Sequence, residues 1–183
     1  MQEFLNWTID TVREDRLLGS WLEEKKFEWT SIVSKFITNI LENNCSVIII
    51  TDDEREWFLD YILSNVNSSK EGRPYFPFYD YRSIYGKFGK MSSELEIDLL
   101  KDMLSISYPN GYCFWYIGKS NHKRANIAKV SNNSFMWIMD ENMQNAFNLQ
   151  STDEAIDFKL IQMFRLFNKT LSASLFAEIS MDC

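Results

Sequence analysis

Residues that interrupt or cross-link a chain are scarce in this sequence of 183 residues, which has only six Gly, three Pro and three Cys. A low content of Gly and Pro favours long helices and strands. The cysteines are Cys45, Cys113 and Cys183, odd in number and far apart, so no disulfide framework is indicated. No apolar run approaches the roughly 20 residues of a membrane span, and the first residues lack the basic start of a signal peptide. A cytoplasmic protein with reduced thiols is expected.

Positively charged residues are fewer than negatively charged ones. The sequence has 19 Lys and Arg and 26 Asp and Glu, which gives a net charge of −7. Direct nucleic-acid binding depends largely on Lys and Arg, so this balance argues against it. Histidine is represented by His122 alone. One histidine with three scattered cysteines makes a zinc site improbable, and neither a GxSxG elbow nor a GxGxxG loop is present. No cofactor is expected.

Hydrophobic spacing divides the chain into helices and strands. The first 44 residues are helical in pattern, and residues 46–51, 75–81, 112–117 and 135–139 read as strands. Ser-x-x-Glu patterns that open at Ser20, Ser93 and Ser151 predict capping boxes at the starts of three helices. A long apolar stripe predicts a closing helix after residue 154. Because strands alternate with helices, the fold class predicted is α/β.

The predicted architecture has three layers, α/β/α, around a small parallel sheet of about four or five strands. Two N-terminal helices precede the sheet and a long C-terminal helix follows it. Pro77 lies in the second strand and favours an edge position, which predicts the strand order 2-1-3-4. We expect one domain over residues 1–183, with residues 1–44 as a helical unit packed on it.

The junction at residues 48–58 is the most informative part of the sequence. A buried β-branched strand there leads directly into a helix, the place where open α/β folds bind anionic ligands. The residues found are Asp52, Asp53, Glu54 and Glu56, whose charge repels a phosphate. One interpretation is that these carboxylates simply begin a helix, which they stabilise. The other is a Mg²⁺ site for phosphoryl transfer, with Asp140 and Lys119 joining Asp52 and Asp53 at the sheet edge.

Aromatic residues indicate a second candidate surface. Trp7 and Trp21 lie near the ends of the N-terminal helices, away from the clearest apolar stripes. Aromatic side chains often anchor protein interfaces. Glu24 and Glu28 would supply an acidic rim. We therefore predict that Trp7, Trp21, Glu24 and Glu28 contact a protein partner, with Asp52 and Asp53 contributing electrostatically.

Several short segments, in this order, resemble the HobA family of small bacterial proteins that bind the replication initiator DnaA. They are Asn6-Trp7, Ser20-Trp21-Leu22-Glu23-Glu24, Glu28-Trp29-Thr30, Thr51-Asp52-Asp53-Glu54-Arg55-Glu56-Trp57-Phe58 and Arg73-Pro74. The resemblance implies a sugar-isomerase-like fold, shared with DiaA, and assembly into homotetramers. It also implies a non-enzymatic adaptor that binds the N-terminal domain of DnaA and promotes its oligomerisation at the replication origin. DNA would then be contacted by DnaA and not by this chain.

Overall fold

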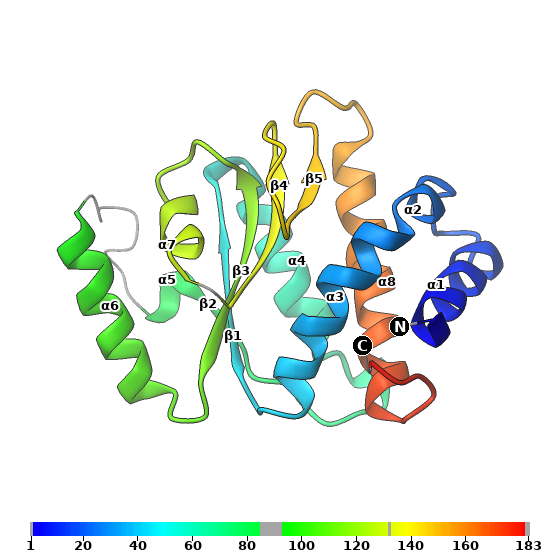
Figure 1. The fold of residues 1–183 in the computed structure, drawn as a ribbon, viewed down its shortest axis with the longest axis horizontal. Helices are drawn as coiled ribbons and strands as arrows, with labels where there is room; N and C mark the ends of the chain where they lie inside the picture. Colours follow the sequence, from blue (N-terminus) through cyan, green and yellow to red (C-terminus); the bar gives the residue numbers. More distant parts are fainter. Residues whose placement is uncertain (1, 85–92, 132, 182–183) are drawn as a thin grey trace.

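A parallel sheet of five strands, in the order β2-β1-β3-β4-β5, forms the centre of the computed structural model, which describes residues 2–84, 93–131 and 133–181 (Figure 1). The predicted α/β class and the strand order are confirmed, and a short fifth strand extends the sheet beyond the fourth. All neighbouring strands pair in parallel. The strands are β1 (Ser46–Thr51), β2 (Phe78–Asp80), β3 (Tyr112–Lys119), β4 (Ser134–Met139) and β5 (Phe147–Leu149).

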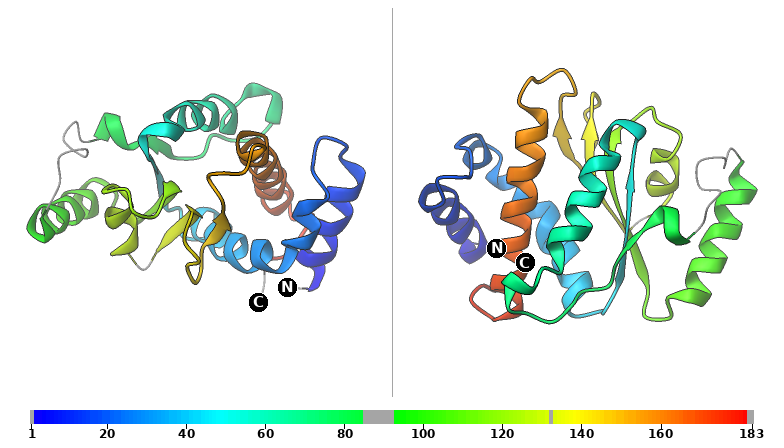
Figure 2. Two further views of the ribbon diagram at one scale, coloured as in Figure 1. Left: turned by 90° about the horizontal axis from the view of Figure 1, so that it is seen from above. Right: turned by 180° about the vertical axis from the view of Figure 1, so that it is seen from behind.

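Helices cover both faces of the sheet, and Figures 1 and 2 show them on opposite sides. One face is covered by α3 (Lys26–Leu41), α4 (Glu56–Val66) and α8 (Ile156–Leu175), and the other by α5 (Tyr81–Ile84), α6 (Glu94–Ser107) and α7 (Ala125–Lys129). The three-layer prediction and the long C-terminal helix are confirmed. Within the described residues, none of the helices combines the length and the apolarity that crossing a membrane requires.

The core on the α3 side of the sheet is built mainly from aromatic rings. Trp115 on β3 lies with its ring centroid 5.0 Å from that of Trp137 on β4. Phe36 of α3 stacks on Phe135 at 4.2 Å, and Phe167 of α8 lies 4.8 Å from Trp115. These side chains are buried. The high aromatic content of the sequence therefore serves mainly to fill the space between the sheet and two long helices.

Two N-terminal helices, α1 (Gln2–Glu14) and the short α2 (Trp21–Glu24), lie outside α3 and α8. Asp15, at the end of α1, holds this layer on α8, because its carboxylate accepts from Arg165 at 2.7 Å and from Lys169 at 2.9 Å. It also accepts from the backbone N–H of Leu17 at 3.0 Å. Burial alone would raise the pKa of Asp15, but these hydrogen bonds lower it well below the usual value of an aspartate.

We expect Asp15→Asn to reduce the free energy of unfolding at pH 7 by about 1–3 kcal/mol, the usual contribution of hydrogen bonds to a charged group. A lowered pKa in the folded state stabilises the protein above the unfolded value of about 4, and this contribution disappears as the pH falls through the folded value. The difference between the two proteins should therefore shrink below about pH 4 in urea titrations. Asp10→Asn, an exposed carboxylate on the same helix, is the control and should show no such convergence.

One of the three predicted capping boxes is confirmed and two are wrong. At Ser93 the hydroxyl accepts from the backbone N–H of Glu96 and the Glu96 carboxylate accepts from that of Ser93, as predicted. Ser20 makes no side-chain cap, and Glu23 instead binds Arg13 of α1 at 2.5 Å. The predicted second helix is also interrupted at Lys25, which separates α2 from α3. Ser151 is bound to Asp140, and α8 begins only at Ile156.

A sheet edge closed by its own ion pairs, and the N-terminal surface

Asp52 lies at the carboxyl end of β1 and is buried, with 2% of its surface exposed. Its Oδ1 atom accepts a hydrogen bond from the backbone N–H of Arg55 at 3.1 Å, which caps the short helix η1 (Asp53–Arg55). Its Oδ2 atom accepts from the backbone N–H of Lys119 at 2.8 Å and from the Arg55 guanidinium at 3.1 Å. Arg55 is buried as well. The carboxylate therefore joins β1, β3 and the start of α4 at one point.

The Asp52 carboxylate lies at the position where folds of this kind bind the anionic group of a ligand. Backbone N–H groups at a helix start and at the end of a neighbouring strand form the anion-binding position of parallel α/β sheets. Here the Asp52 carboxylate occupies two of these donors. The capping interpretation of this residue is confirmed, and the position is closed to phosphate by hydrogen bonds within the chain.

An exposed layer of ion pairs covers the buried one. Lys119 Nζ binds Glu54 at 2.7 Å, and Arg124 binds Asp53 at 2.9 Å. The Arg124 guanidinium is the main reason that the pKa of Asp53 lies below its ordinary value, with His122 Nε2, at 3.4 Å, adding to the effect. These pairs tie the loop after β3 to the start of α4. Surface pairs of this kind contribute little stability singly, so their role here is to fix loop positions.

The predicted magnesium constellation is not assembled. Asp140 accepts from the backbone N–H of Ser151 at 2.7 Å and from its hydroxyl at 2.6 Å, so it serves the turn before α8. Lys119 and Asp52 are bound as described above. No group of three or more His, Cys, Asp or Glu suited to a metal occurs in the ranges 2–84, 93–131 and 133–181. The geometry of the edge supports a structural role for these carboxylates.

Of the residues predicted to contact a partner, the two tryptophans are partly buried. Trp7 packs on Phe4 within the N-terminal layer. Trp21 packs edge-on against Phe147, and its Nε1 atom donates to Gln162 of α8 at 2.8 Å. Both side chains therefore support the position of α1 and α2, and each leaves only part of its ring at the surface.

The four predicted acidic residues differ in exposure. Glu24 and Asp53 are exposed, and a partner could reach both. Glu28 is half-buried and accepts from Lys25 at 2.8 Å and from the backbone N–H of Asn148 on the edge strand β5 at 2.9 Å. Asp52 is buried beneath the ion pairs, so no partner side chain can touch it in this structure.

Sequence reasoning missed Phe27, which is 67% exposed on the first turn of α3. Lys26 Nζ lies 5.2 Å from the centre of its ring. The buried stripe of α3 includes Trp29, Val33 and Phe36, and Phe27 lies on the opposite side of the helix at the spacing of Ser31 and Lys35. That spacing is visible in the sequence and could have identified it. We call the exposed residues Glu24 and Phe27 the α2–α3 shoulder.

The fold and the edge together define a parallel α/β protein whose ligand position is filled by its own side chain. A family profile described as HobA, a DNA replication regulator, matches residues 1–181. The chain therefore belongs to the HobA family. It is 28% identical to the DNA replication regulator protein HobA of Helicobacter pylori, over 99% of this chain and 100% of that protein.

Solved structures agree with this assignment. The chain superposes with a TM-score of 0.75 and 25% identity on a HobA–DnaA (domain I-II) complex from Helicobacter pylori, covering 98% of this chain and 99% of that one. It superposes with a TM-score of 0.72 and 25% identity on HobA from the same organism, covering 98% and 96% of the two chains.

Proposed function

We propose that this chain is a non-enzymatic cytoplasmic adaptor that binds the N-terminal region of the replication initiator DnaA and promotes its oligomerisation at the origin. The observation that carries the proposal is the full-length family match, together with the similarity in fold to a HobA protein bound to DnaA domains I-II. The net charge of −7 agrees with an adaptor that leaves DNA contacts to its partner.

The test is a calorimetric titration of the chain with the N-terminal domains of DnaA from the same organism. We expect saturable binding at micromolar concentration or tighter. No heat of binding at that concentration would exclude the proposal. The non-enzymatic part is tested separately: a phosphatase or phosphosugar-isomerase turnover that Asp52→Asn/Asp53→Asn abolishes would contradict it.

For the contact surface we propose the α2–α3 shoulder. Glu24 and Phe27 are both exposed, three positions apart in the sequence, and combine an acidic group with an aromatic anchor. Trp7, Trp21 and Glu28 then act mainly by holding α1 to α3 in place. Asp53 adds an exposed negative charge, and Asp52 acts only through the position of η1.

Phe27→Ala is expected to weaken DnaA binding by about thirtyfold, which is the loss of about 2 kcal/mol typical of an interface anchor. The fold should be unaffected because the ring is exposed. The matched control is Phe158→Ala on α8, which removes an aromatic ring that is 72% exposed elsewhere. If Phe158→Ala weakens binding and Phe27→Ala leaves it unchanged, the interface lies along α8 and the shoulder is excluded.

Self-association, which we also propose, has its best candidate surface on α6. Leu95, Leu99 and Ile106 are exposed and lie within one narrow stripe of this helix. A second copy of the same stripe would cover it across a twofold axis, the commonest form of self-association. Ile106→Lys should lower the mass measured by light scattering at a given concentration, and Leu17→Lys, on another exposed apolar residue, should not. An unchanged mass for Ile106→Lys would exclude α6.

A further inference from the structure

A groove of about 550 Å³ lies between α4 and α8, which Figure 2 shows side by side on one face of the sheet. The loop after α1 contributes Leu17 to it, α4 contributes Tyr61, and α8 contributes Phe158 and Ile161. Leu17 is 63% exposed and Phe158 is 72% exposed, whereas Tyr61 and Ile161 are partly buried against the core. Two large apolar side chains, far apart in the sequence, are therefore exposed on one groove, which is typical of an interaction site.

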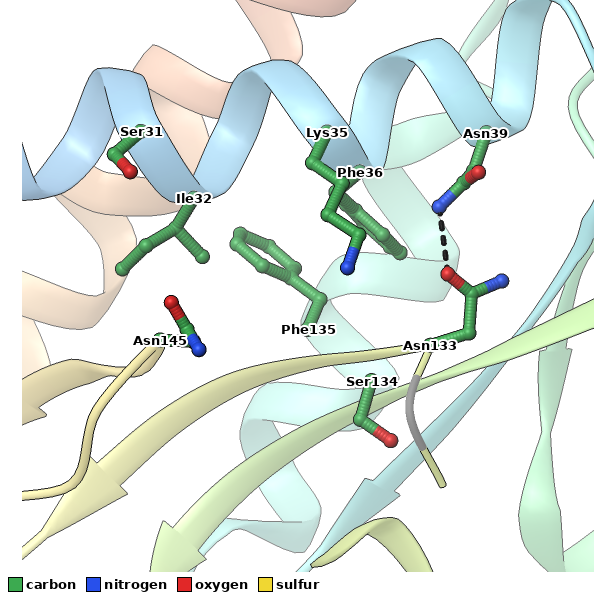
Figure 3. A pocket seen from close by; sticks show the side chains of 9 residues that line it. All are labelled: Ser31, Ile32, Lys35, Phe36, Asn39, Asn133, Ser134, Phe135 and Asn145. Atoms are coloured by element: carbon green, nitrogen blue, oxygen red, sulfur yellow. Dashed lines mark hydrogen bonds between the residues drawn. The ribbon is translucent and has the colours of Figure 1, made fainter.

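The hollow between α3 and β4 (Figure 3) has much less apolar surface to offer a partner. The rings of Phe36 and Phe135 border it, but they stack on each other and are only 3% and 1% exposed. The Asn39 amide there donates to Asn133. These side chains serve the core and its rim, so the groove between α4 and α8 is the better docking surface.

Leu17 is held in place by hydrogen bonds of its backbone on both sides. Its N–H donates to the Asp15 carboxylate at 3.0 Å, and its carbonyl oxygen accepts from Gln162 Nε2 on α8 at 3.1 Å. Gln162 in turn accepts from Trp21 Nε1 at 2.8 Å. The exposed Leu17 side chain is therefore carried by a fixed backbone, and a partner need not order this loop in order to bind.

The groove has an excess of positive charge at one end. Arg165 and Lys169 line it and share the single carboxylate of Asp15. Glu71 also lines it and interacts electrostatically with Arg73, which forms no ion pair within the described residues. The three cations at this end therefore outnumber its two carboxylates, in a chain whose net charge is −7. This balance favours an acidic partner.

The Arg165 guanidinium can still bind another carboxylate. It donates to Asp15 through Nε, and no hydrogen bond to its two terminal NH₂ groups is formed by any residue that the structure describes. The Arg165 side chain is 42% exposed, and that of Lys169 is 41% exposed. A guanidinium that presents two free NH₂ groups suits a carboxylate of a partner.

The apolar residues and the cations follow one another along α8. Phe158 and Arg165 are seven positions apart, which is about 10 Å along the helix axis, and Lys169 lies about 6 Å further. A helix laid along α8 has the same rise per residue. Its positions i, i+3 and i+4 can therefore reach the apolar end when i+7 and i+11 reach the two cations. All five positions lie on one face of a helix.

We propose that this groove binds an amphipathic helix of a partner protein, with large apolar side chains at i, i+3 and i+4 and Asp or Glu at i+7 and i+11. The apolar side chains lie between Leu17 and Phe158. The carboxylates bind the terminal NH₂ groups of Arg165 and the ammonium group of Lys169. Amphipathic helices are commonly recognised in grooves of this kind. The site shares no residue with the α2–α3 shoulder.

The test is a titration of a fluorescent, Ala-rich helical peptide of about 18 residues with the full chain, followed by fluorescence anisotropy. The peptide carries Leu at i, i+3 and i+4 and Glu at i+7 and i+11. We expect saturable binding with a Kd of about 10–100 μM. A peptide with Lys in place of both Glu should bind at least tenfold more weakly, and so should one of the same composition whose Leu residues are spread around the helix.

Two variants of the chain test the two ends of the groove. Phe158→Ala should weaken binding of the acidic peptide at least tenfold, whereas Tyr75→Ala, which removes an aromatic ring that is 78% exposed elsewhere, should leave it unchanged. Lys169→Met should weaken it at least threefold, and Lys101→Met on α6 should not change it. Thermal melts show that each variant is folded.

The proposal would be overturned by no saturable binding at about 1 mM peptide, by equal binding of either control peptide, or by unchanged binding to Phe158→Ala or Lys169→Met. Because the titration contains no DnaA, its failure would leave the proposed function untouched.

Discussion

Replacing Asp52 with Ala is expected to lower the free energy of unfolding by about 3–5 kcal/mol, the range found when one member of a buried ion pair is removed. The Arg55 guanidinium would remain buried, and among the described residues the exposed Glu54 would be its remaining ion-pair partner. The backbone N–H of Lys119 would also lose its acceptor, and that of Arg55 would keep only the bond of 3.3 Å to the Asp52 carbonyl oxygen. Urea denaturation followed by circular dichroism measures the change, and the melting temperature should fall by about 10 °C or more.

Asp53→Ala is the matched control, since it removes a carboxylate from the next residue of the same helix start. Asp53 is exposed and its ion pairs are at the surface, so a change of less than about 1 kcal/mol is expected. Equal losses for the two variants would mean that both carboxylates act only through the charge at the helix start, and that the buried network around Asp52 has no special role.

The elements of the fold were predictable where local patterns and burial agree. The continuous β-branched run in β1 could only be a buried strand, and the three-and-four spacing in α3 and α8 fixed their buried faces. Helix starts were less predictable, because distant residues compete for the same groups. Ser93 and Glu96 bind each other's backbone N–H groups and cap α6, whereas Glu23 binds Arg13 and Ser151 binds Asp140.

At the candidate site, too, contacts between residues far apart in the sequence decide the outcome. Asp52 and Asp53 are adjacent and identical in type, yet one is buried and the other exposed. What separates them is the register of β3 beside β1, which brings the backbone of Lys119 to Asp52. Sequence reasoning predicted that Lys119 would lie near these carboxylates. It could not predict that the backbone N–H of Lys119 would bind Asp52, or that the Lys119 ammonium group would bind Glu54.

Gly118→Ala is expected to cost about 3 kcal/mol or more of stability, through steric overlap and backbone strain together. Gly118 has a φ of +154°, a conformation that L residues rarely adopt. A Cβ atom there would lie 2.7 Å from the carboxyl carbon of Asp52 and 2.9 Å from the Tyr116 hydroxyl. Both neighbours are held by hydrogen bonds to Lys119, so neither can withdraw without losing a bond. Chemical denaturation gives the loss directly.

Gly72→Ala is a reference for an added methyl group without overlap, because Gly72 has a φ of +63°, which L residues tolerate, and nothing lies within 4 Å of its added Cβ. It should cost only about 1 kcal/mol. The Asp52→Ala/Gly118→Ala double variant tests the overlap itself. Removing the carboxyl group makes room for the new methyl group, so the double variant should lose about 1–3 kcal/mol less than the sum of the single losses. If the losses of stability of the two single variants simply add, the methyl group of Gly118→Ala does not overlap with the Asp52 carboxyl group. That result would contradict close contact between these two residues.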